Sequence, residues 1–205
     1  MKKVLILLVA LILGFIGFVA AQPSEFSVSR TVQLAAPPEV VFAAVSDFHR
    51  WEQWSPWVKL DPGIKTAYKG TASGVGAVYE WAGNDQVGEG RMTITDAKPN
   101  QSVTIKLEFI KPWEVTNTAT FTFSPVGENT KTVWMINGPK SFMAKAAGLF
   151  VDMNAMIGAD FDKGLASLKT VAEADFKKRT EEAAKRAADE AAAKSVAAGT
   201  ENIVQ

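Results

Sequence analysis

The sequence predicts a single α+β domain in which a curved antiparallel sheet lies against one long helix near the C-terminus. Three observations lead to this prediction. Residues 26–34 and the segment 63–138 alternate between apolar and polar side chains and are broken by turn signals, which is typical of seven half-buried strands. Residues 36–56 carry the start signals of two short helices. From residue 142 onward, apolar side chains recur every three or four positions, as on one face of a helix.

The N-terminus has the pattern of a targeting segment. Lys2 and Lys3 precede an uncharged apolar run at residues 4–20, which is typical of a signal sequence or an uncleaved anchor. As a helix, this run would span roughly 26 Å, slightly less than the ~30 Å hydrocarbon core of a bilayer. Residues 1–22 are therefore expected to be a signal anchor or a signal peptide. The positive-inside rule places the rest of the chain in the periplasm or outside the cell, either membrane-anchored or secreted after cleavage near Ala21.

Composition excludes several kinds of chemistry. The 205 residues include no cysteine and one histidine, His49, which excludes disulfides, thiol catalysis and multi-histidine metal centres. The 22 basic and 22 acidic residues balance, so no overall charge favours nucleic acid as a partner. No phosphate-binding loop, nucleophile elbow or metal motif occurs. We expect no cofactor and no metal.

Asn117 is the polar exception on an apolar strand face. Residues 114–123 place threonines on one side and, on the other, Val115, Asn117, Ala119, Phe121 and Phe123. An unpaired buried amide costs about 1–3 kcal/mol. Asn117 therefore orients a ligand's polar group, pairs with a helix backbone, or is moved out of phase by a bulge. The alternation alone leaves these three options open.

The longest helix is expected to begin at Phe142, and its apolar stripe should lie across the apolar face of the sheet. The stripe consists of Phe142, Ala146, Leu149, Met153, Ile157, Phe161, Leu165 and Leu168. Gly148, Gly158 and Gly164 weaken this helix. They indicate that sheet side chains, or alternatively a ligand, approach its backbone closely.

The C-terminal segment differs in composition from the domain at residues 24–172. From residue 173 the apolar stripe gives way to Ala, Lys, Glu and Arg. Residues 173–205 are expected to form a solvated helical tail that frays near Gly199. A coiled-coil or partner-binding role for this charged tail is the alternative.

Two short motifs in this order resemble a known superfamily. Residues 35–42 read Ala-Ala-Pro-Pro-Glu-Val-Val-Phe, and residues 51–57 carry the pattern W-x-x-W-S-P-W. Matching positions continue at Asp47, Gly76, Tyr79, Glu80, Trp81, Gly88, Gly90, Thr130, Trp134, Gly138, Gly164, Leu165, Leu168 and Lys169. The chain thereby resembles the START-like, or SRPBCC, superfamily and within it the polyketide cyclase/dehydrase and lipid transport proteins.

The resemblance covers roughly residues 24–172 and implies the helix-grip fold. In this fold a seven-stranded antiparallel sheet curves around a long C-terminal helix, and two short helices follow the first strand. In this chain an apolar N-terminal helix precedes the domain. The resemblance also implies a ligand cavity between the sheet and the long helix.

The residues expected to bind a ligand follow from that implied cavity, and for each the alternative is plain core packing. They are Tyr79, Trp81, Phe109, Asn117, Phe121, Trp134, Phe150, Met153, Ile157 and Phe161. Trp51, Trp54 and Trp57 are expected at the cavity mouth, where they gate it, touch lipid, or plug the end of the core. Phe142, Met143 and Phe150 are candidates to extend such a gate.

Three functions are compatible with these residues. The first is a carrier or sensor that binds a hydrophobic small molecule or lipid at the cell envelope, with residues 4–20 in contact with the membrane. The second is a polyketide cyclase/dehydratase-like enzyme acting on a bulky apolar substrate. The third is an interaction module whose tail meets a protein partner. No catalytic residue is predicted, because Glu80 and Arg91 are expected to form a surface cross-strand pair and His49 to be structural or solvated.

Overall fold

A computed structural model describes residues 2–58 and 60–201, with side chains through residue 194, and contains one seven-stranded antiparallel sheet. The strand order is β1-β7-β6-β5-β4-β3-β2, so β1 and β2 are the edges. The strands are β1 (Glu25–Leu34), β2 (Lys65–Gly70), β3 (Ala77–Ala82), β4 (Glu89–Lys98), β5 (Ser102–Lys111), β6 (Val115–Val126) and β7 (Asn129–Pro139). The predicted number, order and antiparallel pairing of the strands are confirmed.

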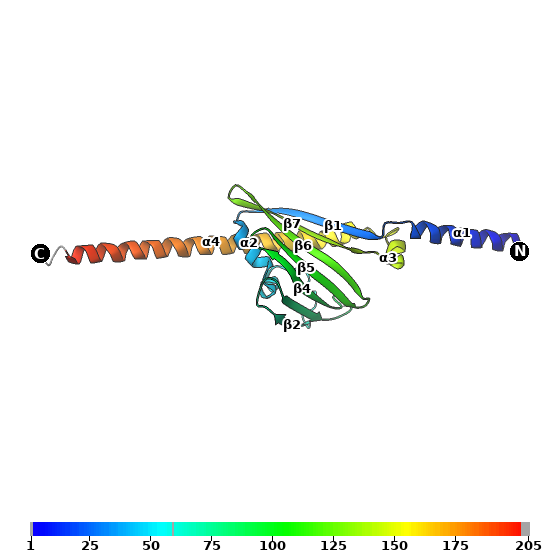
Figure 1. Ribbon diagram of the computed structural model, residues 1–205, viewed down its shortest axis with the longest axis horizontal. Coiled ribbons are helices and arrows are strands. Elements are labelled where there is room, and N and C mark those ends of the chain that lie inside the picture. The colour runs from blue at the N-terminus through cyan, green and yellow to red at the C-terminus, as the bar shows by residue number, and fades with distance from the viewer. Residues whose placement is uncertain (1, 59, 202–205) are drawn as a thin grey trace.

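Helices cover one face of this sheet and extend beyond both of its ends (Figure 1). They are α1 (Lys2–Ala20), α2 (Pro38–Val45), the 3₁₀ helix η1 (Phe48–Gln53), α3 (Phe142–Ala147) and α4 (Met153–Glu201). α4 packs along β1 and contacts α2 and η1. α1 and the C-terminal part of α4 leave the domain at opposite ends.

The two short helices after β1 form for the expected local reasons. Pro38 occupies the first position of α2, where a backbone N–H would have no partner within the helix, so its absence costs no hydrogen bond. Asp47 caps η1 by accepting a hydrogen bond from the His49 backbone N–H. Both helices are then joined to the core by indole N–H groups, because Trp51 donates to the Val45 carbonyl and Trp54 to the Ala44 carbonyl.

The structure corrects the prediction of one long helix beginning at Phe142. This segment contains two helices, α3 and α4, separated by residues 148–152. The Asp152 side chain accepts the backbone N–H groups of Asn154 and Ala155 and so begins α4. The apolar periodicity of the sequence continues across this break, although the helix is interrupted there. The first part of the stripe, Phe142, Ala146 and Leu149, therefore precedes α4, and α3 packs beside α1.

Phe161 anchors α4 to the sheet through an aromatic stack. Its ring lies parallel to that of Trp134 on β7, with centroids 3.9 Å apart, and Trp134 stacks in turn on Phe121 at 4.8 Å. A Cβ at Gly164 would come within 2.8 Å of the Trp134 ring. Gly164 is therefore required for the approach of a sheet side chain, the first of the two explanations offered by the sequence.

The domain ends where Glu173 on α4 meets the start of α2. Its carboxylate accepts the Ala35 backbone N–H at 2.6 Å and a hydrogen bond from Lys169. Burial raises the pKa of Glu173, but the hydrogen bonds from Lys169 and Ala35 outweigh it and hold this pKa below its usual value. Beyond Glu173 nearly every described side chain is exposed.

The helical tail is longer than the sequence predicts. α4 continues through Gly199, where fraying was expected, to Glu201; residues 202–205 lie outside the described part of the chain. At the opposite end, α1 is long and apolar enough to cross a membrane, a property that it shares with signal sequences.

Candidate functional site

Four adjacent rows of inward-facing side chains cross the sheet in the alignment that the strand register sets, and further buried residues, including Phe123 and Thr132, lie beyond them toward α2. Two rows, the covered rows, lie toward α2 and are almost completely buried: Val103, Phe121 and Trp134, followed by Ile94, Ile105, Ala119, Ile136 and Val28. The other two, the open rows, lie toward the β5–β6 hairpin: Tyr68, Tyr79, Met92, Leu107 and Asn117, followed by Trp81, Gly90, Phe109 and Val115. The helices therefore cover one half of the inner face more fully than the other.

Most side chains of the open rows are only half-buried although they are apolar. Tyr79, Met92 and Leu107 pack against the edge of the core without being enclosed by it. Trp81 covers Gly90, where a Cβ would overlap the indole ring, and meets Phe109 edge to face at 5.8 Å. The open rows thus form a partly covered aromatic and aliphatic surface on the concave side of the sheet. Such a surface is suited to apolar ligands.

Asn117 supplies an unpaired acceptor within the open rows. Its side chain is 6% exposed and its Oδ1 has no hydrogen-bond partner among the described residues. The register between β5 and β6 is regular through Leu107 and Asn117, so no bulge moves it out of phase. Gly138 on β7 makes room for it, because a Cβ there would overlap Oδ1. Of the three options that the sequence leaves open, the structure shows neither the helix-backbone pairing nor the bulge.

Four of the ten predicted ligand-binding residues lie together in the open rows: Tyr79, Trp81, Phe109 and Asn117. Phe121, Trp134 and Phe161 form the buried stack described above. Met153 and Ile157 are half-buried at the start of α4. Phe150 is 84% exposed and lies outside this group.

The three tryptophans expected at the cavity mouth lie in the core. Trp51 and Trp54 are buried, with their rings 4.5 Å apart and both indole N–H groups bonded to α2 carbonyls. Trp57 is half-buried and meets Trp134 and Phe161 edge to face. Trp51 and Trp54 thus pack inside the core, and Trp51 also lines the small cavity described below.

A cluster of polar side chains beside Tyr68 was missed by sequence reasoning. The Tyr68 hydroxyl donates to Glu52 Oε1 at 2.9 Å, and the His49 ring stacks on Tyr68 with centroids 4.0 Å apart. His49 Nδ1 lies 2.9 Å from Asp47 Oδ1. Burial, and then the hydrogen bond to Glu52, raise the pKa of Tyr68 far above its usual value, so the phenol stays protonated at neutral pH. Burial, followed by the charge of Glu52, also raises the pKa of Tyr79.

The cavity between this cluster and the open rows is small. It measures about 20 Å³ and is lined by Phe48, Trp51, Glu52, Ser55, Val58, Tyr68, Tyr79 and Met92. This volume is enough for about one water molecule. A larger ligand therefore requires the segments that cover the open rows to move apart.

Arg30 is a cation on the otherwise apolar inner face of β1. Its guanidinium donates to Asp162 Oδ2 at 3.3 Å, to Asn154 Oδ1 at 3.0 Å and to the Asn154 carbonyl at 3.1 Å. It lies over Gly158, where a Cβ would overlap it. Asn154, Gly158 and Asp162 recur every fourth residue along one face of α4. This arrangement, which we call the Arg30 clamp, holds the start of α4 against β1. The four-residue spacing of Asn154, Gly158 and Asp162 is the sequence signal that could have revealed it.

The convex face of the sheet carries charged side chains rather than an apolar surface. Glu80 on β3 bonds to Arg91 on β4, as predicted, and also to Lys69 on β2. The hydrogen bond from Lys69 is the largest of the influences that lower the pKa of Glu80. A depression of about 330 Å³ lies here, lined by Lys65, Thr66, Ala67, Glu80, Trp81, Ala82, Glu89, Gly90, Arg91 and Ile110. It shares Trp81 and Gly90 with the open rows, but its other lining residues include the paired charges of Glu80 and Arg91.

Comparisons with known proteins agree with this geometry. Protein CV1439 of Chromobacterium violaceum is 16% identical, over 74% of this chain and 99% of its own, with a TM-score of 0.51. The Aha1 dimer of Colwellia psychrerythraea is 18% identical, over 72% and 96%, with a TM-score of 0.52. Protein MLL2253 of Mesorhizobium loti is 19% identical, over 71% and 95%, with a TM-score of 0.51. At these identities the likeness establishes the fold and not the activity.

Sequence comparison gives the family. No curated protein matches the chain. A family model described as polyketide cyclase/dehydrase and lipid transport matches residues 25–173, the same range over which the sheet, the short helices and the first part of α4 form one core. The chain therefore belongs to the polyketide cyclase/dehydrase and lipid transport family and has its helix-grip fold.

Proposed function

We propose that this protein binds a hydrophobic small molecule or lipid against the open rows, as a carrier or sensor at the cell envelope. Membership of the family suggests an apolar ligand. The observation that carries the proposal is the gradient of burial along the inner face, from fully buried rows near α2 to half-buried apolar rows near the β5–β6 hairpin. Burying these side chains against a ligand would stabilise the complex by about 25 cal/mol per Å² of apolar surface.

Asn117 gives this surface a means of orienting its ligand. Its unpaired Oδ1 lies over Gly138 on β7, and the residue itself pairs with Leu107 at the β6 end of its row. A ligand hydroxyl or amide would donate to that oxygen and offset the roughly 1–3 kcal/mol that an unsatisfied buried acceptor costs. The expected ligand is therefore an apolar body with a hydrogen-bond donor at one end.

The segment that follows η1 offers a means of entry. Because the present cavity holds about one water, the segments that line it must separate before a lipid fits. On its helical side the cavity is lined by Glu52, Ser55 and Val58. Displacement of residues 55–58 would widen it while the aromatic stack at Phe161 keeps α4 in place.

α1 supports the proposed envelope location. An apolar helix preceded by Lys2 and Lys3 is suited to an N-terminal anchor with the domain on the far side of the membrane. α1 and the Ala-rich tail leave the domain at opposite ends (Figure 1). With α1 in the bilayer, the tail would project away from the membrane surface.

Filling the open rows tests the proposal. Leu107→Trp places an indole ring between Met92 and Asn117, where the ligand would lie. We expect the affinity for an environment-sensitive apolar dye to fall about tenfold or more, since overpacking costs roughly 1–3 kcal/mol. Dye affinity is measured by fluorescence titration of the full chain in nanodiscs, after subtraction of the signal from empty nanodiscs.

The matched control is the adjacent residue on the opposite face. Lys106→Trp adds the same ring to the convex side and removes only a surface ion pair with Glu108, which contributes little. It should leave dye affinity unchanged. Equal affinities for the two variants would show that the dye binds elsewhere and would contradict the proposal.

A second candidate function, an enzyme of the cyclase/dehydratase kind, is favoured by the Tyr68 cluster. The Tyr68 hydroxyl donates its only hydrogen to Glu52, so its oxygen can accept a hydrogen bond from a ligand hydroxyl, and the Glu52 carboxylate beside it is the group that could take up a proton. Mass spectrometry of a co-purified ligand before and after incubation with fresh protein separates the two functions. A mass change that Tyr68→Phe abolishes would establish catalysis, whereas an unchanged ligand supports a carrier.

A further inference from the structure

Large apolar side chains are exposed on α3 and on the segment that joins it to α4. Met143 is 74% and Phe150 84% exposed, with Phe142 and Val151 partly exposed beside them. Trp113, in the turn between β5 and β6, is 81% exposed. Because β7 leads into α3 and pairs antiparallel with β6, this turn lies at the same end of the sheet as α3. We call these five residues the apolar end of the domain.

The apolar end adjoins the C-terminal end of α1. Lys145 on α3 donates to the Ala20 carbonyl at 3.2 Å and to Ser24 Oγ at 3.0 Å. These bonds use the last residue of α1 and the residue before β1. Figure 1 shows α3 between the sheet and α1. The apolar end is therefore continuous with the helix that is suited to cross the membrane.

The length of α1 fixes where this end would lie. The 19 residues of α1 extend roughly 29 Å, which matches the ~30 Å hydrocarbon core. Ala20 would then lie at the interface between hydrocarbon and headgroups, and α3 would lie at the same depth. Tryptophan is enriched at that depth, and phenylalanine is common on the apolar face of interfacial helices. A cluster of five exposed apolar side chains is uncommon on a surface that faces water.

We propose that the apolar end lies in the outer interface of the bilayer that α1 spans, as a second, non-spanning membrane contact. The occupant of this surface is lipid. α3 carries no acidic residue that lipid phosphates would repel. The open rows run toward the same end of the sheet, so ligand exchange would occur directly with the bilayer. The proposal rests on α1 remaining in the membrane, but not on ligand binding.

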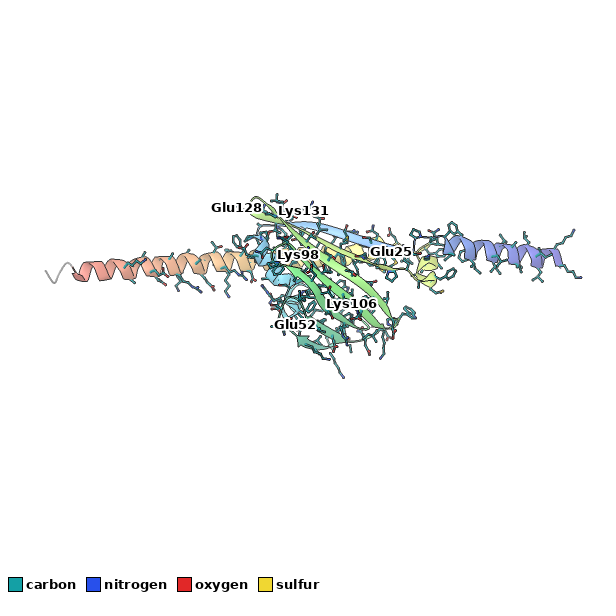
Figure 2. The ribbon with its side chains drawn as sticks, in the orientation of Figure 1. Glu25, Glu52, Lys98, Lys106, Glu128 and Lys131 are labelled. Atoms are coloured by element: carbon teal, nitrogen blue, oxygen red, sulfur yellow. The ribbon has the colours of Figure 1, made fainter. Side chains whose placement is uncertain are left out.

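Single-cysteine labelling tests this placement, because the chain has no cysteine of its own. Met143→Cys and Phe150→Cys are labelled with an environment-sensitive fluorophore, and the full chain is reconstituted in nanodiscs of phosphatidylcholine and phosphatidylglycerol. Leu11→Cys in α1 reports insertion of the anchor. Glu128→Cys, at the opposite end of the sheet (Figure 2), reports the aqueous environment.

The expected result is blue-shifted emission at Met143, Phe150 and Leu11 and loss of that emission when nitroxide-bearing lipids are included. The label at Glu128 should respond only to an aqueous quencher. Water-like emission at Met143 and Phe150 with an embedded Leu11 label would overturn the proposal. Shielding from the aqueous quencher without quenching by lipid nitroxides would indicate a covering protein and would also overturn it.

The same labels separate this proposal from the proposed function. A water-exposed Leu11 label would remove the anchor and with it the membrane contact, while dye binding to the open rows could still be measured. If the labels at positions 143 and 150 are embedded in the bilayer but the unlabelled wild-type chain binds no dye, the ligand site is contradicted and the membrane contact is not.

Discussion

Phe161→Ala is expected to lower the free energy of unfolding by about 3–5 kcal/mol, the range for removing a buried phenylalanine. Phe161 is buried and lies 3.9 Å from the Trp134 ring in a nearly parallel stack. It also meets Trp57 edge to face. Its removal would leave a cavity between α4 and β7 that neither rigid element can close. Chemical denaturation followed by tryptophan fluorescence measures the change.

Phe176 provides the control on the same helix. It lies beyond the domain on α4, with 37% of its surface exposed, so Phe176→Ala should change the free energy of unfolding by less than about 0.5 kcal/mol. Similar losses for the two variants would mean that the tail contributes to the core. The division of α4 at Glu173 would then be wrong.

Gly158→Val is expected to lower the free energy of unfolding by about 1–3 kcal/mol, because the Arg30 guanidinium loses its charge-assisted hydrogen bonds to α4. Any side chain at this position overlaps the Arg30 guanidinium. Either Arg30 gives up its bonds to Asn154 and Asp162, or α4 moves away from β1. In both cases amide hydrogen exchange in the first two turns of α4 should become faster.

Ala159→Val, at the exposed neighbouring position, separates this effect from helix propensity. Propensity alone would favour valine over glycine at position 158 and disfavour valine over alanine at position 159. The Arg30 clamp predicts the opposite ranking, with the larger loss at Gly158. A smaller loss at Gly158 than at Ala159 would show that the guanidinium does not hold α4.

Strand alternation and turn residues were enough to predict the sheet, because period-two burial is a local property of each segment. Residues 102–110 and 114–123 alternate regularly, and both form strands close to those bounds. The break at residues 148–152 was missed because the apolar spacing continues through it. Only the cap at Asp152 marks the second start.

The candidate site could be predicted less completely, because it depends on register between strands. Asn117 stands out from its own strand, and its position is confirmed as buried. Tyr68 lies in a short, weakly patterned segment, and nothing in the sequence pairs it with Glu52. Arg30 occupies an apolar position of residues 26–34, where its significance emerges only when α4 brings Asn154 and Asp162 beside it.

Photoaffinity labelling with a lipid that carries a diazirine at mid-chain tests whether the open rows bind an apolar ligand. The full chain is cross-linked in nanodiscs and digested, and the modified residues are identified by mass spectrometry. We expect modification of the open-row residues Tyr79, Met92, Leu107 or Phe109, and loss of these adducts in Leu107→Trp but not in Lys106→Trp. Adducts confined to α1, α3 and the convex face would contradict the claim that the inner face binds an apolar ligand.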